Sequence, residues 1–182
     1  MAAIPFAVPE NVPGLSELYA EIALRKGNNP NRPNRGVSNM GKVLGHSPKA
    51  LCAHQNLTTF VLDKSIVALP LRVLATLQVA AVLKCSYIIH NNLPRALRAG
   101  IDQKKITAVT QGGEAEFDAK ERAVLNYARQ VAQGRALESG TMSELRRLFS
   151  LQEISELVLI VATYHMIAAI VNPLEVEPDV HA

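Results

Sequence analysis

The most informative stretch of the chain is residues 69–100, which read LPLRVLATLQVAAVLKCSYIIHNNLPRALRAG. A helix is predicted from about Leu71 to beyond Cys85, because apolar residues continue through several helical turns. These residues cover more than one face of the helix, so we expect it to lie deep in the core. Pro94 predicts a break in the preceding turn, and Gly100 is expected to end a second helix.

Most of the remaining chain also has helical patterns. Helix starts are marked by N-cap residues, which are Ser47 before Pro48 and the three capping-box pairs Asp118 with Glu121, Thr141 with Glu144 and Ser150 with Glu153. Gly134 is a further predicted C-cap. No stretch alternates apolar and polar residues with a period of two. The sequence therefore predicts an all-α fold of about seven or eight helices.

Length and composition predict a single domain over residues 1–182. The 182 residues are 48% hydrophobic and 19% charged, which is enough for a sizeable core and argues against disorder. Asn, Pro and Gly gather at residues 27–36, where we expect a loop, and residues 173–182 are expected to form a short C-terminal tail. The apolar tract 157–171 includes polar residues and falls short of a clean membrane span, so a buried helix is predicted there.

Composition also limits the classes of function. Two cysteines are too few for a disulfide-stapled secreted fold, and the N-terminus lacks signal-peptide features, so a cytoplasmic protein is expected. Aromatic residues make up 4%, and no nucleic-acid motif accompanies the basic residues between positions 22 and 62, which suit an anionic ligand or a solvated loop. The sequence has no metal-binding spacing of Cys or His and no phosphate loop, so we predict neither a metal nor a cofactor.

Several segments together resemble the carboxymuconolactone decarboxylase and alkylhydroperoxidase D-like family. In that family a helix of the type LRELAILRVA is followed by a Cys-x-Tyr segment and an Ala-Gly end. The matching residues here are 71–75, 79–81, 85–87 and 98–101. Similar text at 117–125, and again between residues 156 and 177, extends the resemblance over nearly the whole chain. The resemblance implies a helical subunit that assembles into a trimer or hexamer.

The sequence departs from the redox branch of this family at the working positions. That branch uses a Cys-x-x-Cys pair with an upstream Glu and a downstream His, because its chemistry needs two thiols and a proton relay. Cys85 matches the first cysteine, but Val73, Ile88 and Asn92 stand where the glutamate, the second cysteine and the histidine are expected. These replacements argue against peroxidase activity, and a thiol peroxidase that works through Cys85 alone is kept as a minor alternative.

The polar cluster after Cys85 is the candidate catalytic site, because the resemblance places the family's site there. His90 is the candidate acid/base, while Tyr87 and Asn92 are candidates to orient a substrate and stabilise oxyanion charge. Further candidate substrate-binding residues are Asn91, Cys85, His54, Tyr164 and His165. Each group also has a structural interpretation, such as a cap network for the polar cluster, an inert buried thiol for Cys85 and a core histidine for His165.

These residues lead to one predicted function and one alternative. The predicted function is a cofactor-independent, non-redox enzyme that decarboxylates, isomerises or cyclises a small unsaturated acid, lactone or polyketide-like compound, anionic or phenolic in character. The alternative is a catalytically silent, oligomeric scaffold or binding protein on the same fold. Convergence of Tyr87, His90 and His165 on one enclosed cavity would favour the enzyme.

Overall fold

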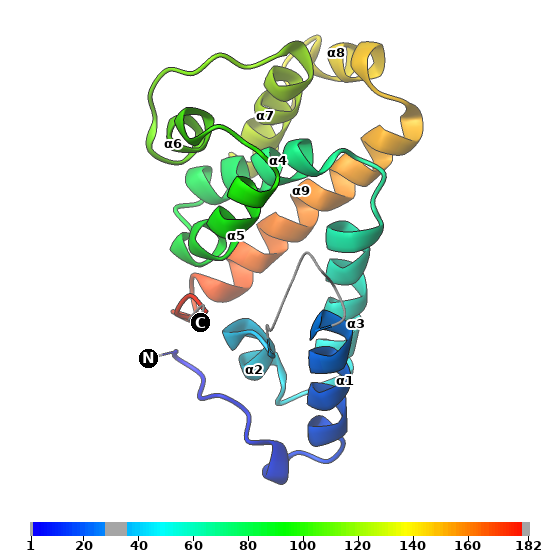
Figure 1. Ribbon diagram of the computed structural model, residues 1–182, viewed down its shortest axis with the longest axis vertical. Coiled ribbons are helices and arrows are strands. Elements are labelled where there is room, and N and C mark those ends of the chain that lie inside the picture. Colours follow the sequence, from blue (N-terminus) through cyan, green and yellow to red (C-terminus); the bar gives the residue numbers. More distant parts are fainter. Residues whose placement is uncertain (1, 28–35, 180–182) are drawn as a thin grey trace.

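The chain folds into a bundle of helices (Figure 1). The computed structural model describes residues 2–27 and 36–179. Nine α-helices lie within these ranges: α1 (Leu15–Gly27), α2 (Asn39–Leu44), α3 (Pro48–Thr59), α4 (Leu69–Val82), α5 (Ser86–Arg98), α6 (Gln103–Gln111), α7 (Ala119–Ala132), α8 (Thr141–Leu148) and α9 (Leu151–Val171). A short 3-10 helix, η1 (Pro9–Asn11), precedes α1, and a π-helical turn, η2 (Phe60–Lys64), follows α3. The described residues contain no strand, so the all-α prediction is confirmed, with nine α-helices instead of about seven or eight.

Helix α4 is the centre of the bundle. It packs against α5, α6, α7 and α9, which surround it in the upper part of Figure 1, whereas α1, α2 and α3 form the lower part. The buried residues of α4 are Leu71, Val73, Leu74, Ala75, Thr76, Leu77, Val79 and Ala80. They point to more than one side of the helix, as its sequence predicted, because neighbouring helices cover it on several sides. A separate small apolar cluster of Ala7, Leu15, Ile22 and Leu51 joins α1 to α3 in the lower part.

The break between the two helices of the 69–100 stretch lies earlier than predicted. Helix α4 ends at Val82, and α5 begins after Cys85, which is its N-cap residue. The chain turns at Lys84, whose φ of 50° lies in the left-handed region without a glycine to mark it in the sequence. Pro94 lies inside α5 and does not end the preceding turn. Proline removes one main-chain hydrogen bond from the helix, and the packing of α5 against α4 and α6 offsets that loss.

Most of the predicted helix ends are confirmed. Ser47 accepts a hydrogen bond from the Ala50 amide with Pro48 in the first helical turn, and both reciprocal capping boxes form, which are Asp118 with Glu121 and Ser150 with Glu153. Gly100 and Gly134 have φ values of 73° and 66°, and each follows the C-cap residue of its helix. These ends follow from local chemistry alone, since each cap satisfies main-chain groups that the helix leaves unpaired.

The predicted capping box of Thr141 with Glu144 is wrong. Gly140 is the N-cap residue of α8, with a φ of 91°, and Thr141 is already the first helical residue. The Thr141 hydroxyl instead pairs with the side chain of Gln130, at 3.1 Å from its amide nitrogen. Gln130 is only 2% exposed, so its buried amide needs a partner, and this long-range requirement outweighs the local cap.

Helix α9 runs diagonally across the molecule in Figure 1 and contributes the longest part of the core. With 21 residues and a mean hydropathy of 2.0 over its most apolar window, it is long and apolar enough to cross a membrane, by length and composition only. However, 56% of that window is buried inside the structure, and α9 packs against α4, α5 and α7. A core helix accounts for the same pattern, in agreement with the buried helix predicted for residues 157–171.

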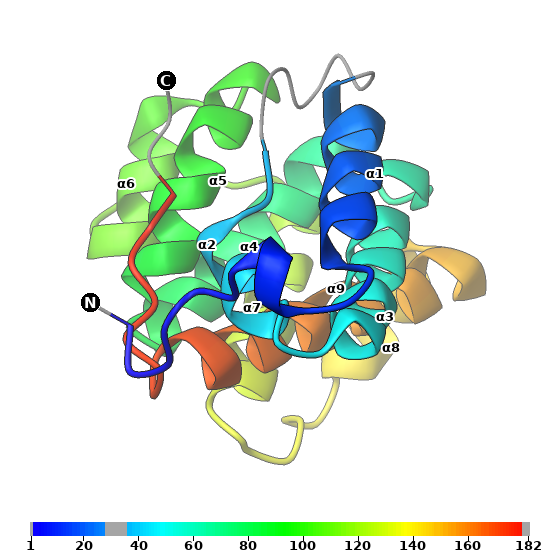
Figure 2. The same cartoon turned by 90° about the horizontal axis from the view of Figure 1, so that it is seen from below.

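The N-terminal segment lies beside the start of the C-terminal tail (Figure 2). The Ala3 amide donates to the Leu174 carbonyl at 2.8 Å, so the N-terminal segment is held against the C-terminal tail. The tail continues along α2 and α5: Asp179 accepts from the Asn39 amide at 2.7 Å, and its own amide donates to the Asn91 side chain at 3.2 Å. The tail is therefore packed in its described part. Most of the predicted loop at 27–36 lies outside the described residues.

Candidate active site

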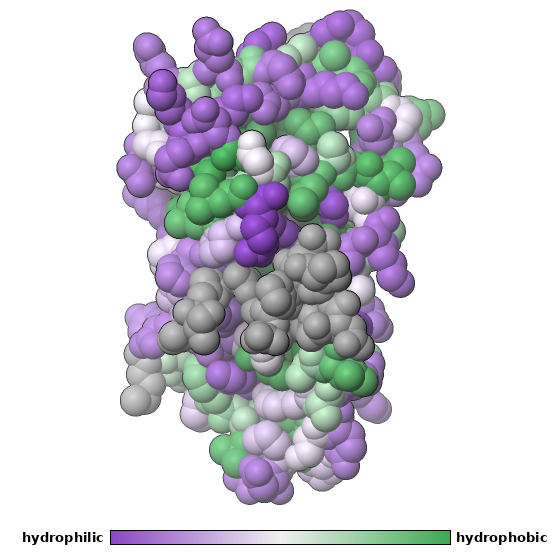
Figure 3. All heavy atoms as spheres, in the orientation of Figure 1, coloured by the Kyte–Doolittle hydropathy of each residue, from purple (hydrophilic) through white to green (hydrophobic). Residues whose placement is uncertain are grey.

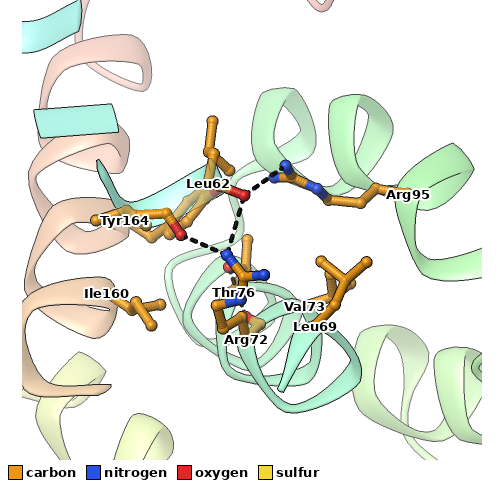
Figure 4. Close-up of a pocket in the computed structure, with 9 residues that line it drawn as sticks. Leu62, Leu69, Arg72, Val73, Thr76, Arg95, Ile160 and Tyr164 are labelled. Atoms are coloured by element: carbon orange, nitrogen blue, oxygen red, sulfur yellow. Dashed lines mark hydrogen bonds between the residues drawn. The ribbon is translucent and has the colours of Figure 1, made fainter. Parts of the chain in front are cut away.

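A small cavity lies where η2, α4, α5 and α9 meet (Figure 4). Apolar side chains form most of its wall, and the polar side chains in it are two arginines, a threonine and a tyrosine. The lining residues are Val61, Leu62, Leu69, Arg72, Val73, Thr76, Arg95, Ile160 and Tyr164. The free volume is about 10 Å³, which is enough for roughly one water molecule.

Arg72 is the central polar residue of the cavity and the one charged residue of the otherwise apolar helix α4. Its Nη1 atom donates to the main-chain carbonyls of Val61 and Leu62, each at 2.9 Å. Its Nε atom is buried without a hydrogen-bond partner. Burial is the main cause that lowers the pKa of Arg72, and the positive charge of Arg95 lowers it further. The cavity therefore holds a half-buried cation whose hydrogen-bonding capacity is only partly used.

Arg95 and Tyr164 approach the same point from two other helices. Arg95, on α5, donates from Nη2 to the Leu62 carbonyl at a long distance of 3.4 Å. Tyr164, on α9, lines the same cavity (Figure 4). Thr76 lies one turn after Arg72 and donates its hydroxyl to the Arg72 carbonyl at 2.9 Å, so that hydroxyl is already used inside α4. The groups that remain for a ligand are the two guanidinium groups and the phenol.

Glu156, on α9, binds the segment that follows η2. Its carboxylate accepts from the Ile66 amide at 2.7 Å and from the Gln152 side chain at 3.0 Å. Burial raises the pKa of Glu156, but hydrogen bonds from Gln152, Ser65 and the Ile66 amide outweigh that effect and lower it. The carboxylate therefore stays ionised, and it fixes the residues that follow η2 to α9.

The structure places one of the eight candidate site residues, Tyr164, in the lining of this cavity. His90, the candidate acid/base, is exposed on the surface of α5. His165 follows Tyr164 on α9 and is half-buried, and His54 is half-buried on α3. None of Tyr87, His90 and His165 lines this cavity, so the convergence that would have favoured an enzyme over a silent scaffold is not found there.

The remaining candidates have structural partners of their own. Tyr87 is buried, and its hydroxyl accepts from the Met40 amide at 3.5 Å, while burial, followed by the charge of Asp179, raises its pKa. The buried Asn92 donates its side-chain amide to the Ile88 carbonyl at 2.8 Å within α5. Asn91 accepts from the C-terminal tail, as described above. These contacts resemble the cap network that the sequence analysis gave as the structural interpretation.

The family assignment comes from a comparison with family models. The model of the carboxymuconolactone decarboxylase family matches residues 48–130, which span α3 to most of α7. The matched segment is somewhat less than half of the chain, and it is similar to the carboxymuconolactone decarboxylase family. The sequence-based resemblance is therefore confirmed. No protein with a curated description matches the chain significantly.

Solved structures extend the likeness of this carboxymuconolactone decarboxylase-like chain beyond the matched segment. An uncharacterized peroxidase-related protein from Silicibacter sp. TM1040 is 20% identical, with 98% of this chain and 92% of that chain covered and a TM-score of 0.79. A peroxidase-related protein from Ralstonia eutropha JMP134, described as an alkylhydroperoxidase AhpD core, is 15% identical, with the same coverage and a TM-score of 0.78. A variant of the debrominase Bmp8 in complex with 2,3,4-tribromopyrrole is 16% identical over 97% of this chain and 91% of that chain, with a TM-score of 0.75. At these identities the likeness shows the shared fold.

The positions at which the resemblance to the redox branch predicts a glutamate, a second cysteine and a histidine hold apolar or amide side chains here. Val73 lines the cavity, whereas Ile88 is 1% exposed inside the core. Cys85 is fully buried at the start of α5, and burial raises the pKa of its thiol. A buried thiol that resists ionisation is a poor nucleophile toward a peroxide. The described residues also contain no group of His, Cys, Asp and Glu that could hold a metal ion.

Arg72 and Arg95 are the cavity residues that the sequence analysis missed. One signal for Arg72 was present, because a single charge in the apolar stretch LPLRVLATLQVAAV is unusual for a core helix. Arg95 had no comparable signal, since it follows Pro94 in a segment with several polar residues. Arg95 is linked to Arg72 through the main-chain carbonyl of Leu62. Every residue has such a carbonyl, so residue types alone do not predict this contact.

Proposed function

We propose that the protein is a cofactor-independent, non-redox enzyme of the carboxymuconolactone decarboxylase family. Its reaction is the decarboxylation of a small unsaturated acid, lactone or polyketide-like compound, or a related proton-transfer isomerisation or cyclisation. The observation that carries the proposal is the convergence of Arg72, Arg95 and Tyr164 on one apolar-walled cavity. The name of the family and the debrominase with the same fold support an enzyme in general terms.

The groups in the cavity match what this chemistry requires. Loss of carbon dioxide, or removal of a proton beside a carbonyl, leaves an electron pair that must be held as an enolate. The Arg72 guanidinium supplies a fixed positive charge for that enolate, in surroundings that Val73 and Ile160 keep apolar. Tyr164 lines the same cavity, and its hydroxyl is the proposed donor of a proton to the carbanion carbon.

Tyr164 replaces His90 as the proposed proton donor. His90 is exposed and lies outside the cavity lining, whereas Tyr164 combines burial with a position beside the Arg72 charge. The His90 assignment from the sequence remains a prediction that the same assay tests.

The test is turnover of a panel of conjugated carboxylic acids and lactones, followed by loss of ultraviolet absorbance and by carbon dioxide release. We expect Tyr164→Phe to reduce kcat at least about a hundredfold, as for the loss of a general acid. Tyr127→Phe is the matched control, because Tyr127 is a buried tyrosine of α7 that does not line the cavity. His90→Ala is expected to keep turnover. Absence of turnover for every compound, or full activity of Tyr164→Phe, would contradict the proposal.

We further propose that the enzyme works as a cytoplasmic homo-oligomer, a trimer or hexamer, on a small anionic or phenolic substrate. Leu151, Val158 and Leu159 of α9 are exposed, at 74%, 41% and 38%. Figure 3 shows apolar surface among polar residues in the upper half of the face drawn, the half that α9 crosses in Figure 1. Exposed apolar patches of this kind are typical of subunit contacts. Native mass spectrometry tests the assembly, and Val158→Glu is expected to dissociate it.

A catalytically silent binding protein or scaffold is the second candidate. The observation that favours it is the free volume of about 10 Å³, because no organic substrate fits until a wall moves. A silent protein would show neither turnover of the panel nor a stabilising ligand that depends on Arg72. Hydroperoxide consumption that disappears in Cys85→Ser would instead support the peroxidase alternative, which the buried thiol disfavours.

A further inference from the structure

The acceptors of Arg72 and Arg95 belong to the π-helical turn η2. Helix α3 passes directly into η2, and the Ser65 amide closes the turn on the Phe60 carbonyl at 3.1 Å, five residues back. Arg72 donates to the carbonyls of Val61 and Leu62, and Arg95 donates to that of Leu62. Both arginines therefore hold the C-terminal end of η2, where the carbonyls carry partial negative charge.

The carbonyls of η2 are incomplete partners for two guanidinium groups. The Arg72 Nε atom is buried without a partner, and the Arg95 bond is long at 3.4 Å. The two positive charges also repel each other, as the lowered pKa of Arg72 reflects after its burial. A carboxylate has two oxygens with a full negative charge between them, and a guanidinium edge binds both in parallel. An anion between the two guanidinium groups would thus meet both positive charges.

We infer that the Arg72–Arg95 pair is a carboxylate-binding site that η2 occupies in the unliganded protein. The ligand's carboxylate takes the place of the Leu62 carbonyl between the two guanidinium groups, and η2 moves aside to admit the rest of the molecule. This inference rests on the proposed function and narrows it. The substrate is a small, planar carboxylic acid with an apolar body, and because the arginines hold its carboxylate, the reaction is the proton-transfer isomerisation or cyclisation, in which the enolate charge develops on that bound carboxylate. No bond is made or broken in this step.

Three features of η2 suit it to such a displacement. A π-helical turn is a poorer helix than an α-turn and is often found at functional sites. The residues after it are tied to α9 through the Ile66 amide and the Glu156 carboxylate at 2.7 Å, so that end has a fixed anchor. Asp63 and Lys64 within it are exposed and Leu62 is half-buried, whereas Val61 is buried in the core, so the outward movement is confined to residues 62–64.

The apolar walls favour a planar carboxylate over phosphate. Val73, Leu69 and Ile160 form the part of the lining away from η2, and they offer no donors to the third and fourth oxygens of a tetrahedral anion. Such an anion would be left with unsatisfied, buried oxygens. An unsaturated or aromatic carbon body, in contrast, packs against these apolar side chains.

The experiment uses benzoate as the probe, with benzamide as its neutral counterpart and inorganic phosphate as the other anion. Dissociation constants from calorimetry and melting temperatures are measured for the full chain and for Arg95→Gln, Arg72→Lys and Arg98→Gln. Arg98 is the matched control, because it is an exposed arginine of the same helix α5 that does not line the cavity. We expect Arg95→Gln and Arg72→Lys each to weaken benzoate binding at least about tenfold and Arg98→Gln to leave it unchanged.

Hydrogen exchange supplies a readout of the displacement itself. Saturating benzoate is expected to speed exchange of the Ser65 amide, which closes η2, while the core amides of α4 become slower. Equal stabilisation by benzamide, or tighter binding of phosphate, would overturn the carboxylate assignment. Benzoate binding that both arginine variants retain, or no binding at all, would overturn the site. Benzoate binding that depends on the arginines, without turnover of any panel compound, would refute the proposed enzyme and leave this site standing.

Discussion

Replacement of Arg72 by glutamine should destabilise the protein through η2 more than through α4. The substitution removes two hydrogen bonds of 2.9 Å from a charged donor to the Val61 and Leu62 carbonyls. At about 1.5 kcal/mol each, these bonds are worth about 3 kcal/mol. The substitution also removes the buried Nε atom, which has no hydrogen-bond partner, and this raises the unfolding free energy by about 1 kcal/mol. The expected net loss is about 2 kcal/mol, which corresponds to a fall of about 4–8 °C in Tm for a chain of this size.

Urea denaturation followed by circular dichroism measures this loss, and Arg95→Gln is the control. The single bond of Arg95 is 3.4 Å long, so its removal should cost no more than about 0.5 kcal/mol. Hydrogen exchange then locates the effect, with faster exchange expected at the Ser65 amide in Arg72→Gln. If Arg72→Gln were as stable as Arg95→Gln, the arginine would not be holding η2, and the argument for a displaceable turn would fail with it.

Three further predictions concern residues outside the cavity. Iodoacetamide should label the exposed Cys52 and leave Cys85 unmodified in the folded protein, because burial and a raised pKa protect the Cys85 thiol. Mass spectrometry of the labelled peptides measures this, and rapid labelling of Cys85 would contradict its burial. Lys84→Gly should raise the unfolding free energy by about 0.5 kcal/mol, since φ is 50° there, whereas the matched Lys84→Ala should not raise it. The pKa of Glu153 is lowered by its hydrogen bonds from the Ser150 amide and side chain, so its contribution to stability is present above the ordinary value of 4.5 and is lost as the pH falls through the lowered folded value. Glu153→Gln should therefore show a flatter dependence of unfolding free energy on pH in the acid range, and an unchanged slope would argue against the cap.

Much of the fold could be predicted because helix ends are chemically local. Asp118 and Ser150 each cap a helix with a glutamate three residues on, and the structure forms both boxes. The prediction failed where a distant partner decides the conformation. The Thr141 hydroxyl is hydrogen-bonded to Gln130 of another helix instead of capping its own. Lys84 adopts a left-handed φ because the chain must turn back between α4 and α5. Neither requirement has a counterpart in the neighbouring sequence.

The site was predicted less well for a related reason. The resemblance directed attention to the residues that follow Cys85, and it predicted departures from the redox branch at Val73, Ile88 and Asn92. It could not indicate what replaces them, because the new polar groups are not at those positions. Arg72 precedes Val73 by one residue, and Tyr164 comes from α9, outside the segment that the family model matches. Only the packing of α4 against α9 brings them together.

The exchange of residues around α4 also reverses the sign of charge at the cavity. In the redox branch, as the resemblance implies, a glutamate stands at the position of Val73, where it can relay a proton to a thiol. Here Val73 is neutral and Arg72 and Arg95 bring two positive charges to the same cavity. A cationic cavity next to a reactive cysteine would favour its thiolate. The pKa of Cys85 is instead raised, with burial as the cause and no arginine among the groups that act on it. The positive charge is therefore not directed at the thiol, and an anion that enters the cavity is the partner that it suits.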